Sequence, residues 1–383
     1  MPSRLERRLR ARLSELAAAG LTRSLQLPSG IDLSSNDYLG LAAHPLLRQH
    51  MAEAILRDGC GSTGSRLLRG ERDSFSELER RFAAFKGAER ALYFSSGYLA
   101  NLAILTTLAE ADDVIFSDER NHASLIDGMR LSRARRVIFP HCDAAALGRL
   151  LRDERAGAQA FVVTESLFSM DGDIAPLAAY DVLCREHGAA LIVDEAHAVG
   201  VYGSRGTGLL EAAGAGALVS IDTAGKALGV SGAFVSGPAW AIDSLIQRAR
   251  PFIFSTAPPP ALAAAIDASL TIIEAEPWRR NTLLARAAFL RRRLRETGIA
   301  VPDGVSQIIP VVIGDNDRAV LVSQLLRHQG FDARAIRPPS VPPRTARLRL
   351  SVHTDLSEAT LDGFVTVLAG ALEEAAVCSA ASL

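Results

Sequence analysis

Lysine is almost absent from this chain. Its 42 basic residues include only two lysines, Lys86 and Lys226, and all the others are arginine. The base composition of the gene accounts for most of such a bias, but the bias has a chemical consequence. Any reaction that needs a lysine amine has only these two side chains to use.

Other features are also missing, and each absence excludes a class of protein. The net charge of −1 provides no basic face, so neither a nucleic acid nor a membrane is expected as a partner. The longest uncharged stretch, residues 91–109, is interrupted by Ser, Gly, Asn and Thr and is not the continuous apolar run of a membrane span. The N-terminus carries charges throughout and has no apolar core of signal-peptide length.

The cysteines exclude two further kinds of site. The chain has four of them, Cys60, Cys142, Cys184 and Cys378, and they form no CxxC motif and no metal-ligand spacing. We therefore expect no bound metal. Cysteines without these patterns fit a reducing compartment best, so we expect a cytoplasmic protein.

The order of strand and helix patterns predicts an α/β fold. A chain of 383 residues is too long for one compact core. In its middle part, short apolar runs alternate with amphipathic helices, which indicates a mostly parallel sheet covered on both faces. Seven runs have the character of strands: 91–94, 114–117, 136–139, 160–164, 190–193, 218–221 and 233–235.

The same patterns divide the chain into three predicted parts. Residues 1–43 form an N-terminal helix and arm, and residues 44–275 form a large α/β domain. Residues 276–383 form a small C-terminal α+β domain, because a long Arg-rich helix after Pro277 precedes a small mixed sheet and further helices.

Residues that follow buried strands are the candidates for chemistry, because active sites of open α/β sheets lie at the carboxyl ends of the strands. Lys226 follows the run 218–221 among small neutral residues, where a partly desolvated amine is nucleophilic toward an aldehyde. Lys86 instead ends an amphipathic helix before Gly87, where a lysine suits the helix dipole and faces water. Lys226 is therefore the predicted catalytic lysine, and a surface lysine is the alternative.

Other strand ends supply the partners that a catalytic lysine would need. Asp194 could pair with a protonated pyridine nitrogen; the alternatives are a helix cap or a metal pair with His197, for which no third ligand is evident. Gly97 opens a helix directly after a strand, where free N–H groups suit a phosphate. His122 could stack on a flat ring, although a lone histidine is more often structural. Together these residues match a site for pyridoxal 5′-phosphate (PLP).

These residues lie within longer segments that resemble the α-oxoamine synthases, a family of fold-type I PLP enzymes. The resemblance runs from residues 34–40 to residues 347–351, and its most specific parts are 164–173, 193–197 and 223–226. It implies a large, mostly parallel sheet domain with a small C-terminal α+β domain. It also implies PLP as the cofactor and a homodimer with shared active sites.

Carried over position by position, the resemblance gives each matching residue a role. Lys226 would hold the cofactor as a Schiff base and move the substrate α-proton, with Asp194 and His122 as the other catalytic residues. The cofactor contacts would come from Gly97, Tyr98, His122, Ser169, Asp194, His197, Thr223 and Lys226. The substrate contacts would come from Arg23, Asn36, His122, Arg337 and Ser340. Ser255 and Thr256 would reach the phosphate bound by the neighbouring subunit.

The resemblance also has departures. Tyr98 stands where phenylalanine is common, which matters little if the backbone binds the phosphate. Ala224 replaces a bulkier aromatic residue beside the lysine. Ser340 stands where threonine is expected near the substrate, so it keeps the hydroxyl and loses a methyl group.

Within the family, residues 335–342 most resemble an acyltransferase branch of biotin biosynthesis. That branch condenses L-alanine with a pimeloyl thioester, carried by CoA or by acyl carrier protein, and releases CO₂. A sister branch that acylates glycine from acetyl-CoA shares every cofactor residue and is the nearest alternative. A non-catalytic PLP-fold binding protein is a second alternative, but such proteins usually lack the lysine.

Overall fold

A computed structural model describes residues 2–154 and 157–380 of the chain. They form two compact units, which are described separately. The larger unit comprises residues 36–169 and 173–282, and the smaller unit comprises residues 1–35, 170–172 and 283–383. The N-terminal segment and the C-terminal part of the chain therefore fold into the same unit, whereas the predicted breaks lay after residues 43 and 275.

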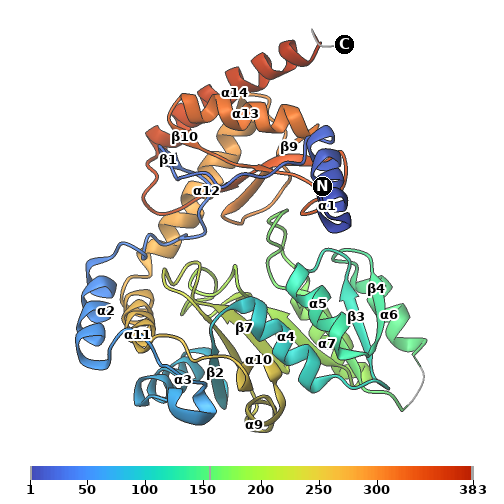
Figure 1. Cartoon of the computed structure of the whole chain (residues 1–383), viewed down its shortest axis with the longest axis vertical. Helices are drawn as coiled ribbons and strands as arrows, with labels where there is room; N and C mark the ends of the chain where they lie inside the picture. The colour runs from blue at the N-terminus through green and yellow to red at the C-terminus, as the bar shows by residue number, and fades with distance from the viewer. Residues whose placement is uncertain (1, 155–156, 381–383) are drawn as a thin grey trace. The chain divides into compact units, whose positions relative to one another are not determined.

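A seven-stranded sheet forms the centre of the larger unit (Figure 1), in the order β2-β8-β7-β6-β5-β3-β4. From β7 to β4 all neighbouring strands are parallel, whereas β8 is antiparallel to both β7 and β2. The strands are β2 (Arg90–Phe94), β3 (Val114–Asp118), β4 (Arg135–Phe139), β5 (Ala160–Glu165), β6 (Ala190–Asp194), β7 (Val219–Thr223) and β8 (Ala233–Gly237). The predicted α/β fold with a mostly parallel sheet is confirmed.

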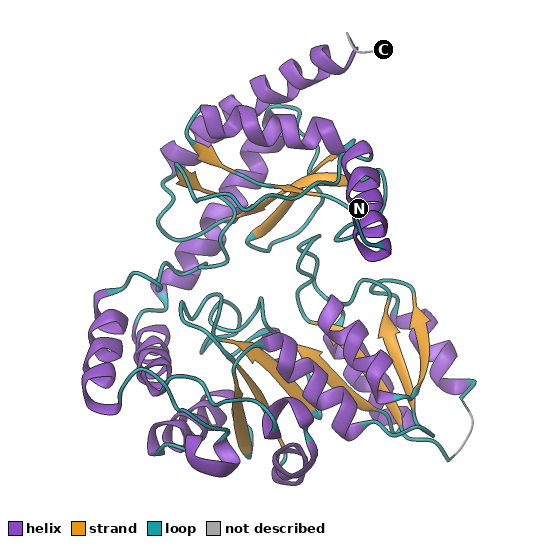
Figure 2. Ribbon diagram, viewed as in Figure 1, coloured by secondary structure: helices purple, strands orange, loops and turns teal. Residues whose placement is uncertain are grey.

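Figure 2 shows helices packed around this sheet. They are α2 (Pro45–Asp58), the π-helix η1 (Arg66–Gly70), α3 (Asp73–Lys86), α4 (Gly97–Leu108), α5 (Ala123–Ser132), α6 (Ala144–Arg152), α7 (Leu177–His187), α8 (Leu209–Ala213), α9 (Ala239–Arg248), α10 (Arg250–Ile253) and α11 (Pro260–Ala275). The hydrophobic core joins α4, α5 and α9 to the central strands, whose side chains are almost all buried. Burial on both faces explains why these strands are continuously apolar in the sequence.

The smaller unit contains two short sheets. β11 (Ala335–Ile336), β12 (Ala346–Ser351) and β9 (Ile308–Gly314) form an antiparallel sheet in that order, and β1 (Ile31–Asp32) pairs in parallel with β10 (Phe331–Asp332). Its helices are α1 (Arg4–Ala18), α13 (Asn316–His328) and α14 (Glu358–Ala380). Helix α12 (Trp278–Glu296) begins in the larger unit and ends in the smaller one.

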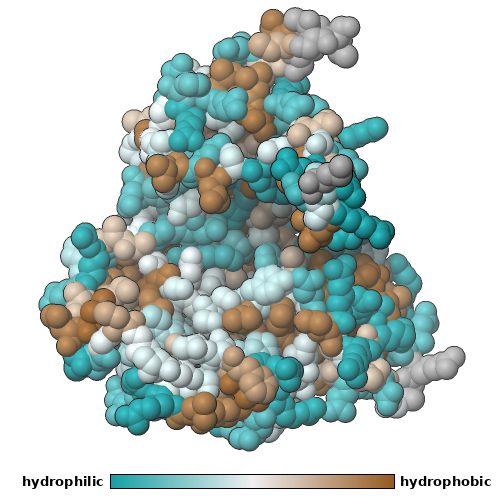
Figure 3. Space-filling view, in the orientation of Figure 1, coloured by the Kyte–Doolittle hydropathy of each residue, from teal (hydrophilic) through white to brown (hydrophobic). Residues whose placement is uncertain are grey.

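Large apolar side chains reach the surface of the larger unit, as the brown areas in Figure 3 illustrate. Leu56 on α2 and Leu68 on η1 are 88% and 85% exposed, and Ile55 and Leu67 beside them are also exposed. Within the described part of the chain, none of the helices combines the length and the apolar character needed to cross a membrane.

Candidate active site

Lys226 lies at one end of a chain of hydrogen bonds in the larger unit. It is half-buried, and its Nζ lies 2.8 Å from Nε2 of His197. The Nδ1 of the same ring lies 2.7 Å from the hydroxyl of Tyr38, which donates to Oδ1 of Asn36 at 3.0 Å. Tyr38 has a single proton to donate, so Nδ1 of His197 carries the ring proton. Nε2 of the same ring is the atom that faces the amine of Lys226.

Asp194 is held from two sides. The residue ends β6 and is 7% exposed, its Oδ1 accepts from the backbone N–H of Ala196 at 2.9 Å, and its Oδ2 accepts from Nδ2 of Asn101 at 2.7 Å. Nδ2 of Asn101 also donates to the hydroxyl of Ser124 at 2.9 Å, which lies 2.7 Å from Nδ1 of His122. Asn101 and Ser124 thus connect His122 to Asp194.

The environment of His122 favours a neutral ring. Burial lowers the pKa of His122, and the nearby Lys226 lowers it further, while Asp194 acts in the opposite direction. A neutral imidazole can lie flat against an aromatic cofactor without the cost of desolvating a charge.

The start of α4 meets the end of β7. A Cβ added to Gly97 would have the Cβ of Thr223 as its nearest neighbour, at 4.0 Å. Ser96 caps the helix by accepting from the N–H of Leu99 at 3.3 Å, so the N–H groups of Gly97 and Tyr98 have no acceptor within the helix. The phenol of Tyr98 donates to Asp127 on α5. The side chain of Tyr98 thus contacts α5, while its backbone lies in the first turn of α4.

Glu165 is a fully buried carboxyl group that the sequence analysis did not select. It ends β5, beside Asp194 in the sheet register. Its Oε2 accepts from the N–H of Ser169 at 3.3 Å, while its Oε1 is buried without a hydrogen-bond partner among the described residues. Burial and the charge of Asp194 raise the pKa of Glu165 to about 8, although Lys226 opposes this. Glu165 could have been selected by the rule that active-site residues lie at the carboxyl ends of buried strands.

The expectation that Lys86 faces water was wrong. Its side chain is 6% exposed, and its ammonium group forms ion pairs of 2.8 Å with both Glu195 and Asp222. These partners are distant in sequence, so the position of Lys86 at a helix end gave no sign of them. Burial lowers the pKa of Lys86, but the two carboxylates outweigh burial and raise it. The amine of Lys86 is thus held by two carboxylates and is not a free nucleophile.

The loop after Lys226 lies against the segment that carries Tyr38. Gly229 has a φ of +69°, and a Cβ at this position would lie 2.5 Å from the backbone N of Ala42 and 2.7 Å from the carbonyl carbon of Leu41. Only glycine satisfies both the backbone conformation and the close approach. This contact holds the two ends of the Lys226–Asn36 hydrogen-bond chain together.

The remaining predicted substrate residues belong to the smaller unit. Arg23, Arg337 and Ser340 line one pocket of about 400 Å³ there. The guanidinium of Arg337 donates to the carbonyls of Gly20 and Thr22, and Arg23 donates to the carbonyl of Pro338 at 3.1 Å. The N-terminal arm and the 335–342 segment thus build this pocket jointly.

Ser255 and Thr256 follow α10 in the larger unit. They line a small cavity together with Ser95, two residues before Gly97. The hydroxyl of Ser255 donates to the carbonyl of Thr256 at 3.5 Å, and Thr256 is exposed.

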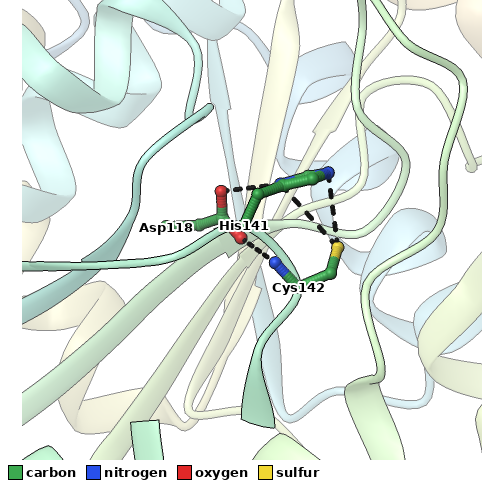
Figure 4. A group of neighbouring side chains, drawn as sticks. All are labelled: Asp118, His141 and Cys142. Carbon is green, nitrogen blue, oxygen red and sulfur yellow. Dashed lines mark hydrogen bonds and ion pairs between the residues drawn. The ribbon is translucent and has the colours of Figure 1, made fainter. Parts of the chain in front are cut away.

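Among the described residues, one group has the composition of a metal site: Asp118, His141 and Cys142 (Figure 4). Both ring nitrogens of His141 already contact carboxylates, Nδ1 with Asp118 at 2.9 Å and Nε2 with Asp173 at 2.6 Å. Burial lowers the pKa of His141, but these hydrogen bonds prevail and raise it to about 11. His141 thus joins Asp118 and Asp173 through its two ring nitrogens.

Comparison with known proteins gives a consistent result. The family model for class I and II aminotransferases matches residues 28–368. The 8-amino-7-oxononanoate synthase of Anaeromyxobacter dehalogenans strain 2CP-1 is 46% identical over 381 residues, covering 95% of each chain. The enzyme of the same name from Burkholderia orbicola is 48% identical over 361 residues, covering 92% of this chain and 88% of its own. The chain belongs to the 8-amino-7-oxononanoate synthase family.

Solved structures extend the comparison to the fold. A serine palmitoyltransferase from S. paucimobilis, solved with a bound PLP–myriocin aldimine, is 29% identical with a TM-score of 0.91, covering 98% of this chain and all of its own. The 8-amino-7-oxononanoate synthase of Francisella tularensis is 29% identical with a TM-score of 0.78, covering 90% of this chain and 98% of its own. The fold-type I prediction is therefore confirmed.

Membership in the 8-amino-7-oxononanoate synthase family makes the chain a PLP-dependent acyltransferase of biotin biosynthesis. The residues present fit the cofactor. A lysine amine, a fixed buried carboxylate and an open helix N-terminus lie at the ends of β7, β6 and β2, which is the set of groups that PLP requires.

Proposed function

We propose that the chain condenses L-alanine with a pimeloyl thioester, releasing CO₂ and forming 8-amino-7-oxononanoate. The observation that carries this proposal is the 46% identity, over 95% of both chains, to a curated enzyme of that name. The pocket lined by Arg23, Arg337 and Ser340 supports it, because guanidinium groups are suited to carboxylates.

In this proposal Lys226 holds the cofactor covalently and moves the proton at the substrate α-carbon. When bound, PLP supplies an electron sink for the negative charge that develops at that carbon. Asp194 holds a proton on the pyridine nitrogen, and the bonds from Asn101 and Ala196 keep its carboxylate in one orientation. Such fixed charges stabilise a developing charge without reorganisation.

The hydrogen bond from His197 to Tyr38 orients the imidazole beside Lys226. His197 and Ser169 would also bind the phenolic oxygen of the cofactor, and His122 would cover the ring. Gly97 and Tyr98 would bind the phosphate through their N–H groups, and Thr223 through its hydroxyl. The proximity of Gly97 to Thr223 supports a shared phosphate site.

The remaining predicted residues would bind the carboxylates of the two substrates. Asn36 and Arg337 would bind the α-carboxylate of alanine, with Ser340 nearby, and Arg23 would bind the far carboxyl end of the acyl chain. Arginine offers two parallel N–H donors to a carboxylate, which a lysine cannot do.

We further propose a homodimer in which Ser255 and Thr256 contact the phosphate bound by the partner subunit. Exposed apolar side chains on α2 and η1, such as Leu56 and Leu68, support a subunit interface, because monomeric surfaces rarely gather such groups. A dimer whose dissociation releases PLP is expected in ultracentrifugation. A monomer that retains PLP would exclude this arrangement. We also propose a cytoplasmic location, which the free thiols of Cys60, Cys142 and Cys184 support.

The substrates can be tested with a matrix of alanine, glycine and serine against acetyl, pimeloyl and palmitoyl thioesters, scored by CO₂ release. Alanine with pimeloyl-CoA or pimeloyl-acyl carrier protein should have the highest kcat/KM. Glycine should be a poor substrate but not an inert one, since one methyl group in an apolar pocket contributes about 1–3 kcal/mol. A maximum for glycine with acetyl-CoA would assign the chain to glycine C-acetyltransferase instead.

A further inference from the structure

The second lysine of the chain forms a buried ion cluster in the larger unit. The ammonium of Lys86 donates to Oε2 of Glu195 at 2.8 Å, to Oδ1 of Asp222 at 2.8 Å and to the carbonyl of Thr207 at 2.5 Å. These three bonds use all the donors that an ammonium group has. Lys86, Glu195 and Asp222 are called the Lys86 cluster below.

Both carboxylates of the Lys86 cluster are chain neighbours of proposed cofactor residues. Glu195 directly follows Asp194 at the end of β6, and Asp222 directly precedes Thr223 at the end of β7. The two strands are parallel neighbours, and the N–H of Glu195 donates to the carbonyl of Ile221 at 2.7 Å. One ammonium group therefore joins the two strand ends that carry the site.

Further bonds fix the carboxylates of the Lys86 cluster. Oε1 of Glu195 accepts from the N–H groups of Leu209 and Leu210 at 2.6 and 3.0 Å, and Oδ2 of Asp222 accepts from the hydroxyl of Ser220 at 3.0 Å. Each carboxylate thus has one oxygen on Lys86 and the other on the surrounding chain. Without the ammonium group, one oxygen of each carboxylate would lose its hydrogen bond to Lys86.

The charges of the Lys86 cluster depend on the lysine. The side chains of Glu195 and Asp222 are 0% exposed, and burial raises the pKa of Asp222 to about 6 even though Lys86 lowers it. Without Lys86, two buried carboxylates would face each other, and one of them would take up a proton. Removing one partner of a buried ion pair is strongly unfavourable for this reason.

We propose that Lys86 is a positioning residue for the cofactor: through Glu195 and Asp222 it fixes the ends of β6 and β7, from which Asp194, Thr223 and Lys226 reach PLP. The inference rests on the proposed function, which assigns these three residues to the cofactor. Lys86 itself touches neither cofactor nor substrate in this scheme.

The test compares Lys86→Met with Arg81→Met. Arg81 lies on the same helix, five residues earlier, and it also pairs with two carboxylates, but these are Asp267 and Glu274 on α11. Lys86→Met should weaken PLP binding by about 10- to 100-fold, the loss that is typical when residues that orient the ligands of a bound metal are replaced. It should also change the visible absorption of bound PLP and its pH dependence. Arg81→Met should leave both properties unchanged.

A double variant covers the case in which Lys86→Met does not fold. Lys86→Met with Asp222→Asn removes one charge of each sign, so the cluster keeps its net charge while the bridge is lost. This variant should fold and should show the same weakened PLP binding. Wild-type affinity and absorption in either folded variant would overturn the positioning role.

Borohydride reduction separates this inference from the proposed function. In Lys86→Met, Lys226 is the only lysine of the chain. A reduced PLP label on Lys226 would support the cofactor assignment whatever the affinity. Loss of the label in Lys86→Met, with a label on Lys86 in the wild type, would refute both the assignment and the positioning role.

Discussion

Lys226 and His197 share a hydrogen bond of 2.8 Å, and the other nitrogen of the same imidazole bonds a third residue, Tyr38. Tyr38 donates its proton to Asn36, so it can only accept from His197. Nδ1 of the ring therefore carries a proton, and Nε2 faces the amine. A residue 188 positions before Lys226 in the sequence thus orients the imidazole beside it.

Removing the phenol of Tyr38 should disturb this arrangement. In Tyr38→Phe, Nδ1 of His197 loses its acceptor, and the tautomer with a proton on Nε2 becomes competitive. We expect kcat to fall by about tenfold or more, the lower end for residues that orient a catalytic group, with a smaller change in KM for alanine. Steady-state kinetics and ¹⁵N NMR of the imidazole would measure both effects.

Tyr180→Phe is a suitable control for that experiment. Tyr180 is fully buried, but its hydroxyl has no hydrogen-bond partner among the described residues. Its loss should leave kcat and the tautomer of His197 unchanged. Equal effects of the two substitutions would mean that the phenol of Tyr38 has no specific role.

Lys226→Ala should abolish turnover and the visible absorption of the covalently bound cofactor. Borohydride reduction of the wild type should place the cofactor label on Lys226, the half-buried lysine beside His197. Peptide mapping would detect it. A label on Lys86 would refute the whole site assignment.

Asp194→Asn should bind PLP but turn over slowly. A neutral amide cannot keep a proton on the pyridine nitrogen, so the ring loses its capacity to accept charge, and we expect a loss of about a hundredfold or more. Asp243→Asn is the control, because Asp243 forms an exposed ion pair with Arg90. Near-normal turnover of Asp194→Asn would show that another group protonates the ring.

Glu165 should make the stability of the cofactor-free protein depend on pH. Its pKa is about 8 in the folded chain against an ordinary value of 4.5, so the folded state holds an extra proton between these values. The stability linked to this proton is complete below pH 4.5 and is lost as the pH rises through 8. Glu165→Gln should remove this dependence, and urea unfolding at several pH values would measure it. Parallel curves for the two proteins would contradict the raised pKa.

The fold was largely predictable because its strands are buried on both faces and are therefore apolar along their whole length. All seven predicted strands of the large sheet occur. The antiparallel direction of β8 was not predicted, since its apolar pattern is the same in either direction. Strand direction depends on the connection, and β7 and β8 are joined by the loop that carries Lys226.

Much of the site was also predictable, because residues at strand ends converge. Contacts between segments that are distant in sequence were not predictable. Asn101 lies inside α4, where nothing in its sequence neighbourhood indicates that it bonds Asp194. Lys86 is a second example. Its position at the end of a helix predicted a solvent-exposed side chain, but Glu195 and Asp222, which are distant in sequence, bind it in the interior.

The close approach of Gly229 to Leu41 and Ala42 has a consequence for local unfolding. The loop with Lys226 and the segment with Tyr38 touch through their backbones and are also joined through His197. Neither segment can open without breaking both connections, so the two should open as one cooperative unit. Amide hydrogens in residues 38–42 and 226–230 should therefore exchange at matching rates, although almost two hundred residues separate them along the chain.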